Sequence, residues 1–184
     1  MGRITLGVGL FSALTLLSGT TGAQKTARIP SNYGNVNGGS LCDATAGNLI
    51  ANCGFETGDF SAWVQSGDLS FTTVENVPHS GIWAVYTGPV DSLGYISQNL
   101  PTNPDGVYNL TFWLANNSTP NHFQASWDGV VIFDAADMPD FFYTQFEFDG
   151  LVASTDSTEL KFGFYNLPDF FAFDDVVVVS AVAR

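Results

Sequence analysis

Short stretches of alternating apolar and polar residues recur along most of this chain. In the clearest one, residues 108–114, Tyr, Leu, Phe and Leu occupy every second position, with Asn, Thr and Trp between them. Because side chains alternate between the two faces of a β-strand, this order predicts a strand with one apolar face. Turn-forming Gly, Pro, Asn and Asp separate such runs, and no stretch has helical periodicity. The pattern therefore predicts an all-β domain.

Further strands are expected wherever an apolar run is bounded by turn residues. They cover residues 48–52, 69–73, 82–87, 94–100, 123–134, 143–152, 160–165 and 171–182. The range 123–134 is expected to be a hairpin that turns at Asp128-Gly129. The run 176–179 is apolar at every position, which is typical of a central strand buried on both faces. Strands at such short and even intervals indicate a sandwich or a barrel.

The first 23 residues differ from the rest of the chain. Arg3 precedes an apolar run from Ile4 to Leu17, and Thr21-Gly22-Ala23 supplies the small residues of a cleavage site. This order predicts a secretory signal peptide over residues 1–23, because the run is short and interrupted for a membrane span. Residues 24–47 are expected to form a flexible arm, since Gly, Asn and Ser are frequent there. The folded domain is then expected over residues 48–184.

The two cysteines favour a disulfide. Cys42 and Cys53 are the only cysteines in the chain and lie eleven residues apart. Export would place them in an oxidising compartment, where such a pair closes a structural bridge. A metal site formed by two cysteines would need further His or Cys ligands, and the Cys-x-x-Cys spacing of redox motifs is absent.

Composition and charge narrow the range of partners. The 184 residues include 18 acidic and 5 basic ones, for a formal net charge of −13, and 14% are aromatic. Many aromatics with few charges favour a folded β domain over disorder. Nucleic acids and anionic membrane surfaces are poor partners, because both are bound through clusters of Lys and Arg. Neutral sugars, cations and basic partners remain compatible with this surface.

Candidate catalytic groups are few. His79 and His122 are the only histidines, and the chain has neither a Gly-x-Ser-x-Gly nucleophile motif nor a zinc-type histidine spacing. A glycoside hydrolase needs only two carboxylates. However, Glu147-Phe148-Asp149 does not extend into the Glu-x-Asp-x-x-Glu pattern of jelly-roll β-glucanases. We therefore predict no catalytic residues and no enzyme, with a glycoside hydrolase as the less favoured alternative.

Four segments of the chain carry a resemblance to a known family, and they read NLIANCGFETGDFSAW (48–63), HSGIWAVYTGP (79–89), YNLTFWLANN (108–117) and FAFDDVVVV (171–179). They resemble the galactose-binding-like jelly-roll modules, a broad group that includes many carbohydrate-binding modules. The likeness is closest to small secreted bacterial proteins of the PEP-CTERM-associated type, although the sequence lacks their sorting tail. The resemblance implies a jelly-roll β-sandwich of about eight to ten antiparallel strands. It also implies an extracellular protein, and the departure from the family at the sorting tail favours a released one.

Carbohydrate is the expected ligand. Aromatic rings stack on sugars, and amides form hydrogen bonds with sugar hydroxyls. Trp113 and Tyr165 point away from the apolar face of their strands, while Trp127 adjoins the predicted turn and is expected to be exposed there. The expected ligand-binding residues are Trp113, Asn116, Gln124, Trp127 and Tyr165. The alternative for Trp113 and Tyr165 is packing within a two-sheet core.

A structural calcium ion is the cofactor that the resemblance implies. Glu56 in GFE and Asp174 in DDV match the carboxylates that help to hold calcium in those modules. Carboxylates inside an apolar run also need a partner, and calcium prefers oxygen ligands. The alternative is that Asp174 accepts hydrogen bonds at a strand bulge without a metal.

The sequence as a whole predicts a secreted, non-catalytic module that binds a carbohydrate or an extracellular glycan. It combines an export signal, an all-β domain and aromatic residues next to amides. The alternative function is that of a calcium-stabilised structural or matrix protein of the cell exterior without a small ligand.

Overall fold

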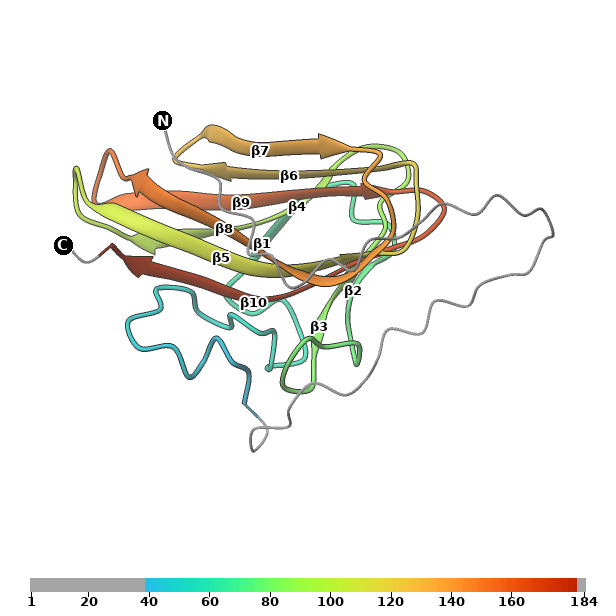
Figure 1. The fold of residues 1–184 in the computed structure, drawn as a ribbon, viewed down its shortest axis with the longest axis horizontal. Coiled ribbons are helices and arrows are strands. Elements are labelled where there is room, and N and C mark those ends of the chain that lie inside the picture. Colours follow the sequence, from blue (N-terminus) through green and yellow to red (C-terminus); the bar gives the residue numbers. More distant parts are fainter. Residues whose placement is uncertain (1–38, 182–184) are drawn as a thin grey trace, which may run out of the picture.

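The computed structural model describes residues 39–181, which fold into two five-stranded antiparallel sheets packed face to face (Figure 1). Sheet 1 has the strand order β1-β4-β9-β6-β7, and sheet 2 has the order β2-β3-β10-β5-β8. The strands are β1 Val64–Gly67, β2 Thr72–Glu75, β3 Ala84–Thr87, β4 Gly94–Pro101, β5 Val107–Asn116, β6 Asn121–Trp127, β7 Val130–Ala136, β8 Phe141–Val152, β9 Ser157–Asn166 and β10 Phe171–Ser180. The predicted all-β sandwich is confirmed.

Some sequence predictions concern other parts of the chain. The expected signal peptide over residues 1–23 and most of the expected arm over 24–47 lie outside the described residues, as do residues 182–184. Within residues 39–181, no helix is long and apolar enough to cross a membrane.

The core lies between the apolar face of β5 and the inner face of sheet 1. Tyr108, Leu110, Phe112 and Leu114 are buried, as the pattern predicts. Phe112 lies at the centre of a cluster of rings, which includes Phe123, Phe146, Phe148, Phe162 and Phe173. Offset and edge-to-face contacts between such large rings fill the space between the sheets and contribute strongly to stability.

The hairpin of β6 and β7 turns where the sequence predicts. Asp128 has a φ of 54° and Gly129 a φ of 74°. Two consecutive positive φ values are what the tightest β-hairpin turns require, and Asp-Gly is among the residue pairs that adopt them most readily. By contrast, the apolar pattern does not predict β1, a four-residue strand at the edge of sheet 1.

Residues 48–52 do not form the expected strand, and this prediction is corrected. They belong to an irregular segment beside β10 (Figure 1), in which Leu49 N donates to Val178 O at 2.9 Å. The Asn48 side chain accepts from Val178 N and donates to Val176 O. Strand β3 pairs with β10 only from Phe171 to Phe173, so this segment satisfies backbone groups beyond that point. A side-chain amide makes part of the pairing, which an apolar pattern does not reveal.

The predicted disulfide between Cys42 and Cys53 is present, and both residues are buried. Cys42 N also donates to Asp175 Oδ1 at 3.2 Å, and Val176 N donates to Cys53 O at 3.0 Å. The bridge therefore fastens the N-terminal part of the described chain to β10, at the middle of sheet 2.

Candidate functional site

The outer surface of sheet 1 carries a group of aromatic and polar side chains that we call the sheet 1 face. On β6 and β9 the burial pattern alternates, with the phenylalanines facing inward and the intervening residues facing outward. The face consists of Tyr95, His122, Gln124, Asp134, Lys161 and Tyr165. Two of the five expected ligand-binding residues, Gln124 and Tyr165, therefore lie on it.

Strand register aligns several of these residues in one row across the sheet. Tyr95 pairs with Gly163, Gly163 pairs with Gln124, and Gln124 pairs with Asp134. In the neighbouring row, Tyr165 pairs with His122. Directly opposed residues on adjacent strands have Cβ atoms about 4.5–5.5 Å apart. Strand β4, strand β9 and the β6–β7 hairpin, which are separated in the sequence, thus present their side chains to one ligand-sized area.

The ring of Tyr95 lies across Gly163. A Cβ atom at Gly163 would be 2.7 Å from Tyr95 Cε1, so glycine is what leaves room for the ring. On the same strand, Lys161 Nζ lies 4.8 Å from the centroid of the Tyr95 ring, a cation–π contact. The ring is thus held in place from two sides, and an aromatic group in a fixed position loses little entropy on binding.

Asp134 joins two neighbouring side chains of the face. His122 Nε2 is hydrogen-bonded to Asp134 Oδ1, and Gln124 Nε2 donates to Asp134 Oδ2 at 3.4 Å. The hydrogen bond with His122 is the main reason why the pKa of Asp134 is lowered, and loss of contact with water acts in the opposite direction without cancelling it. Asp134 is therefore a carboxylate at neutral pH and offers hydrogen-bond acceptors beside the amide of Gln124.

The outer surface of sheet 2 is different, because the loop of residues 76–83 crosses it. The ring of His79 stacks on Trp113, with centroids 3.7 Å apart and an interplanar angle of 14°. Tyr143 Oη donates to Val77 O at 2.9 Å. Trp113 and Tyr165 thus point outward from opposite sheets, and the structure does not bring them together as one stacking platform.

Asn116 and Trp127 lie inside the sandwich. Trp127 is 3% exposed, and its Nε1 donates to Val152 O at 2.8 Å, so the expectation of an exposed ring beside the turn is corrected. Trp127 continues the inward alternation of β6, which explains its direction. Asn116 is 1% exposed and donates to two main-chain carbonyls, while its own carbonyl accepts from Asn166. Neither side chain offers a surface to a sugar.

The two expected calcium ligands bind opposite ends of one turn instead. Asp174 Oδ2 accepts from His79 N at 2.8 Å and from Ser80 N at 3.1 Å. Glu56 Oε1 accepts from Ile82 N at 3.0 Å and from Trp83 N at 3.2 Å. Calcium requires oxygen atoms around it, whereas amide hydrogens surround these carboxylates. The contacts therefore do not fit a calcium ion held by this pair.

Asp174 and Asp175 belong to a buried polar network beneath the same turn. Asp175 Oδ2 accepts from Ser80 Oγ at 2.7 Å and is hydrogen-bonded to His79 Nδ1 at 2.7 Å. Burial raises the pKa of Asp174 well above its ordinary value, and the neighbouring Asp175 adds to this effect. Hydrogen bonds from backbone N–H groups act in the opposite direction. The network anchors the turn to β10 and is closed to solvent, so we regard it as structural.

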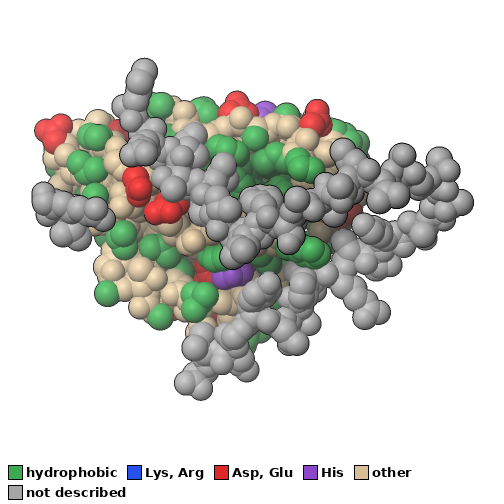
Figure 2. All heavy atoms as spheres, viewed as in Figure 1, with side chains coloured by type: hydrophobic (Ala, Val, Ile, Leu, Met, Phe, Trp, Pro, Cys, Tyr) green, Lys and Arg blue, Asp and Glu red, His purple; other side chains and the backbone are tan. Residues whose placement is uncertain are grey.

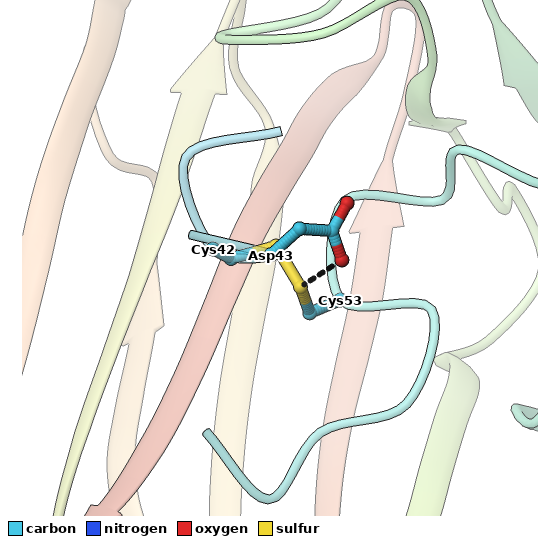
Figure 3. A group of neighbouring side chains, drawn as sticks. All are labelled: Cys42, Asp43 and Cys53. Carbon is cyan, nitrogen blue, oxygen red and sulfur yellow. Dashed lines mark hydrogen bonds between the residues drawn. A yellow bond between two sulfur atoms is a disulfide. The ribbon is translucent and has the colours of Figure 1, made fainter. Parts of the chain in front are cut away.

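One other cluster combines side chains of the metal-binding type. Among residues 39–181, the only group of three such side chains is Cys42, Asp43 and Cys53 (Figure 3). Both sulfur atoms are joined in the disulfide, and a thiolate is the form of cysteine that binds metals. This group therefore provides no metal site.

Sequence reasoning missed four residues of the sheet 1 face: Tyr95, His122, Asp134 and Lys161. The alternation in residues 94–100 and 160–165 already indicates that Tyr95 and Lys161 point away from the core. The sequence does not reveal the register between β4, β9, β6 and β7, and this register decides which outward-facing residues become neighbours.

Comparison with solved structures shows the same kind of sandwich in carbohydrate-binding modules. The TmCBM61 module, solved in complex with beta-1,4-galactotriose, superimposes with a TM-score of 0.61 and 23% identity over 73% of this chain and 99% of its own. The CBM22-1 xylan-binding domain of Xyn10C from Paenibacillus barcinonensis superimposes with a TM-score of 0.54 and 14% identity over 76% of this chain and 100% of its own.

A third structure, the CBM22-1-GH10 modules of xylanase 10B from Clostridium thermocellum with xylohexaose, gives a TM-score of 0.58 and 18% identity over 76% of this chain and 30% of its own. No family model and no curated protein sequence matches the chain. At these identities the comparisons show the fold alone, a two-sheet β-sandwich resembling that of carbohydrate-binding modules.

Proposed function

We propose that this protein is a secreted, non-catalytic module that binds carbohydrate through the sheet 1 face. The observation that carries this proposal is the row across sheet 1, in which the Tyr95 ring lies over Gly163 beside Gln124 and Asp134. Two solved structures with similar folds are described as a complex with galactotriose and as a xylan-binding domain, which supports the ligand class.

The side chains of the face match what a sugar offers. A pyranose ring has an apolar surface that stacks on an aromatic ring, and hydroxyl groups around its rim. Tyr95 and Tyr165 supply the rings, while Gln124, Asp134 and Lys161 supply donors and acceptors for the hydroxyls. Because Lys161 already lies against Tyr95, one positive charge is held within the site, and no second Lys or Arg occurs in residues 39–181. This surface suits neutral sugars.

The carboxylates support binding rather than hydrolysis. A glycoside hydrolase needs a carboxylic acid that stays protonated near neutral pH beside a second carboxylate. On the sheet 1 face, Asp134 has a lowered pKa, which is the wrong direction for a general acid. Asp174 has a raised pKa, but it is fully buried beneath the turn on the side of sheet 2. Asp134 therefore has the wrong protonation state for a general acid, and Asp174 is out of reach of a substrate.

Secretion is part of the proposal. The buried disulfide is the kind of bond that forms and persists outside the cytosol, and the first 23 residues have the order of an export signal. Both agree with a binding module that acts on an extracellular glycan.

A glycan array with the oxidised protein from residue 24 onward tests the function. We expect hits within one class of neutral β-linked polysaccharide, and we expect Tyr95→Ala to weaken them by about 1–3 kcal/mol, the usual range for a stacking aromatic. Thr111→Ala, on the outer side of sheet 2, is the matched control and should bind as the parent does.

Three outcomes would contradict the proposal. A blank array together with strong self-association would favour the alternative of a structural or matrix protein. Release of reducing ends from a bound polysaccharide would show a hydrolase instead. Equal binding by Tyr95→Ala and the parent would move the site away from the sheet 1 face.

A further inference from the structure

A hollow lies at the edge of sheet 2, on the opposite side of the sandwich from the sheet 1 face. It has a volume of about 470 Å³, and we call it the β2–β3 groove. Strands β2 and β3 form its floor, where Thr73 pairs with Tyr86. The residues that line the groove include Phe71, Thr73, Glu75, Asn76, Tyr86 and Phe170.

Three aromatic rings line the groove. Tyr86 and Phe170 stack with centroids 4.2 Å apart and an interplanar angle of 13°. Phe71 also lines the groove and is 61% exposed. Three rings around one hollow create a surface on which an apolar or positively charged group binds well.

The backbone of Phe71 is strained, and burial does not explain the strain. Its φ is 53°, in the left-handed region that bulky residues avoid, and Gly88 N donates to its carbonyl at 3.1 Å. Phe55 has a similar φ of 58°, but its side chain is fully buried and packs on other rings, which offsets the strain. Phe71 lacks such packing, and strained residues of this kind concentrate at ligand-binding sites.

The charges around the groove are negative. Glu75 lines it, and the pKa of Tyr86 is raised first by burial and then by the negative charges of Asp169 and Glu75. Lys161, the only Lys or Arg within residues 39–181, contacts Tyr95 on the sheet 1 face instead. Figure 2 shows acidic and hydrophobic side chains on one face of the molecule. Within residues 39–181, no Lys or Arg side chain is therefore left for these rings.

We propose that the β2–β3 groove binds an organic cation, namely a protonated or quaternary amine carried on an apolar body. The ring faces of Phe71, Tyr86 and Phe170 attract the positive charge, and Glu75 complements it at the side of the groove. Thr73 Oγ1 donates to Glu75 Oε1 at 3.1 Å, which orients that carboxylate. This site is separate from the sheet 1 face and does not depend on the function proposed for it.

Choline and its neutral tert-butyl analogue, in which carbon replaces the nitrogen, provide a matched pair of probes. Titration of each into the oxidised protein from residue 24 onward is followed by NMR shifts of the backbone amides of residues 71–77 and 86. We expect choline to bind at least about threefold more tightly than the analogue, since a cation gains from the ring faces and the neutral molecule does not.

Substitutions locate the effect. Phe71→Ala and Glu75→Gln should each weaken choline binding by about threefold or more, because each removes one part of the attraction. Phe142→Ala is the control, since Phe142 lies on β8 and is 63% exposed, much as Phe71 is. Equal affinity for choline and its analogue, shifts outside the groove, or loss of binding in Phe142→Ala as large as in Phe71→Ala would overturn the proposal.

Discussion

The sheet 1 face and the β2–β3 groove both gather aromatic side chains, but they differ in what surrounds the rings. On the sheet 1 face, Tyr95 rests on Gly163 and contacts Lys161, so the chain itself supplies the cation. In the groove, Tyr86 and Phe170 stack on each other beside Glu75. We therefore propose different ligands for the two surfaces, neutral hydroxyl-rich rings for the sheet 1 face and a positively charged group for the groove.

The two regions also differ in how the structure holds them. The sheet 1 face is formed by four regularly paired strands, β4, β9, β6 and β7. The groove lies beside two four-residue strands and includes a residue in a strained conformation. A ligand surface built on long, regular strands is rigid before binding, whereas one built on short strands at a sheet edge relies on local turns.

The largest expected effect comes from comparing the two phenylalanines in the left-handed region. Phe55→Ala should lower the free energy of unfolding by about 3–5 kcal/mol, because it removes a buried ring that packs on Trp63 and Phe173. Phe71→Ala should change it by less than about 0.5 kcal/mol, since that ring is mostly exposed. Denaturant unfolding measures both, and a large loss from Phe71→Ala would show that this ring serves the fold rather than a ligand.

A smaller effect distinguishes two aspartates by the sign of their pH dependence. Asp174 has a raised folded-state pKa, so the stability associated with its protonated form is present at low pH and is lost as the pH rises from about 3.8 through the raised pKa. Asp134 has a lowered folded-state pKa, so its contribution is present above its ordinary pKa of 3.8 and is lost as the pH falls.

Urea unfolding across the acid range measures these two slopes. Asp174→Asn should make stability fall less steeply with rising pH, and Asp134→Asn should make it fall less steeply with falling pH. The Asp134 effect should be the smaller one, because solvent screens this exposed residue. Identical slopes in the two variants would contradict the difference in environment.

The smallest expected effect concerns calcium. Because amide hydrogens already bond to Glu56 and Asp174, we expect the melting temperature to be the same with calcium and with a chelator. A metal bound only by the folded state raises the melting temperature with its concentration. An increase with calcium that Glu56→Gln abolishes would therefore contradict this expectation and restore the ion that the sequence suggests.

The sequence predicts those features that depend on neighbours along the chain. Alternation in residues 108–114 correctly assigns the buried face of β5, and Asp128-Gly129 correctly marks a hairpin turn. Alternation also shows that Trp113 and Tyr165 point out of their strands, yet it does not tell which sheet each strand joins. The strands belong to different sheets, so the two rings separate.

Features that depend on distant pairing could not be predicted. Tyr95, Gly163 and Gln124 become neighbours only through the register of β4, β9 and β6. Similarly, the pattern of residues 48–52 predicts a strand. In the structure, however, the side chains of Asn48 and Gln98 form hydrogen bonds with backbone groups that would bond to a neighbouring strand in a regular sheet. Side-chain pairing of this kind leaves no periodic signal.

The central claim, that carbohydrate binds the sheet 1 face, is tested most directly by mapping a bound glycan onto the protein. An oligosaccharide of the class found on the array is titrated into labelled protein, and shifts of the backbone amides are followed by NMR. We predict shifts in β4, β6 and β9 around Tyr95, Gln124 and Tyr165, with residues 71–77 unchanged. Shifts confined to the β2–β3 groove, with the sheet 1 face unchanged, would contradict the account.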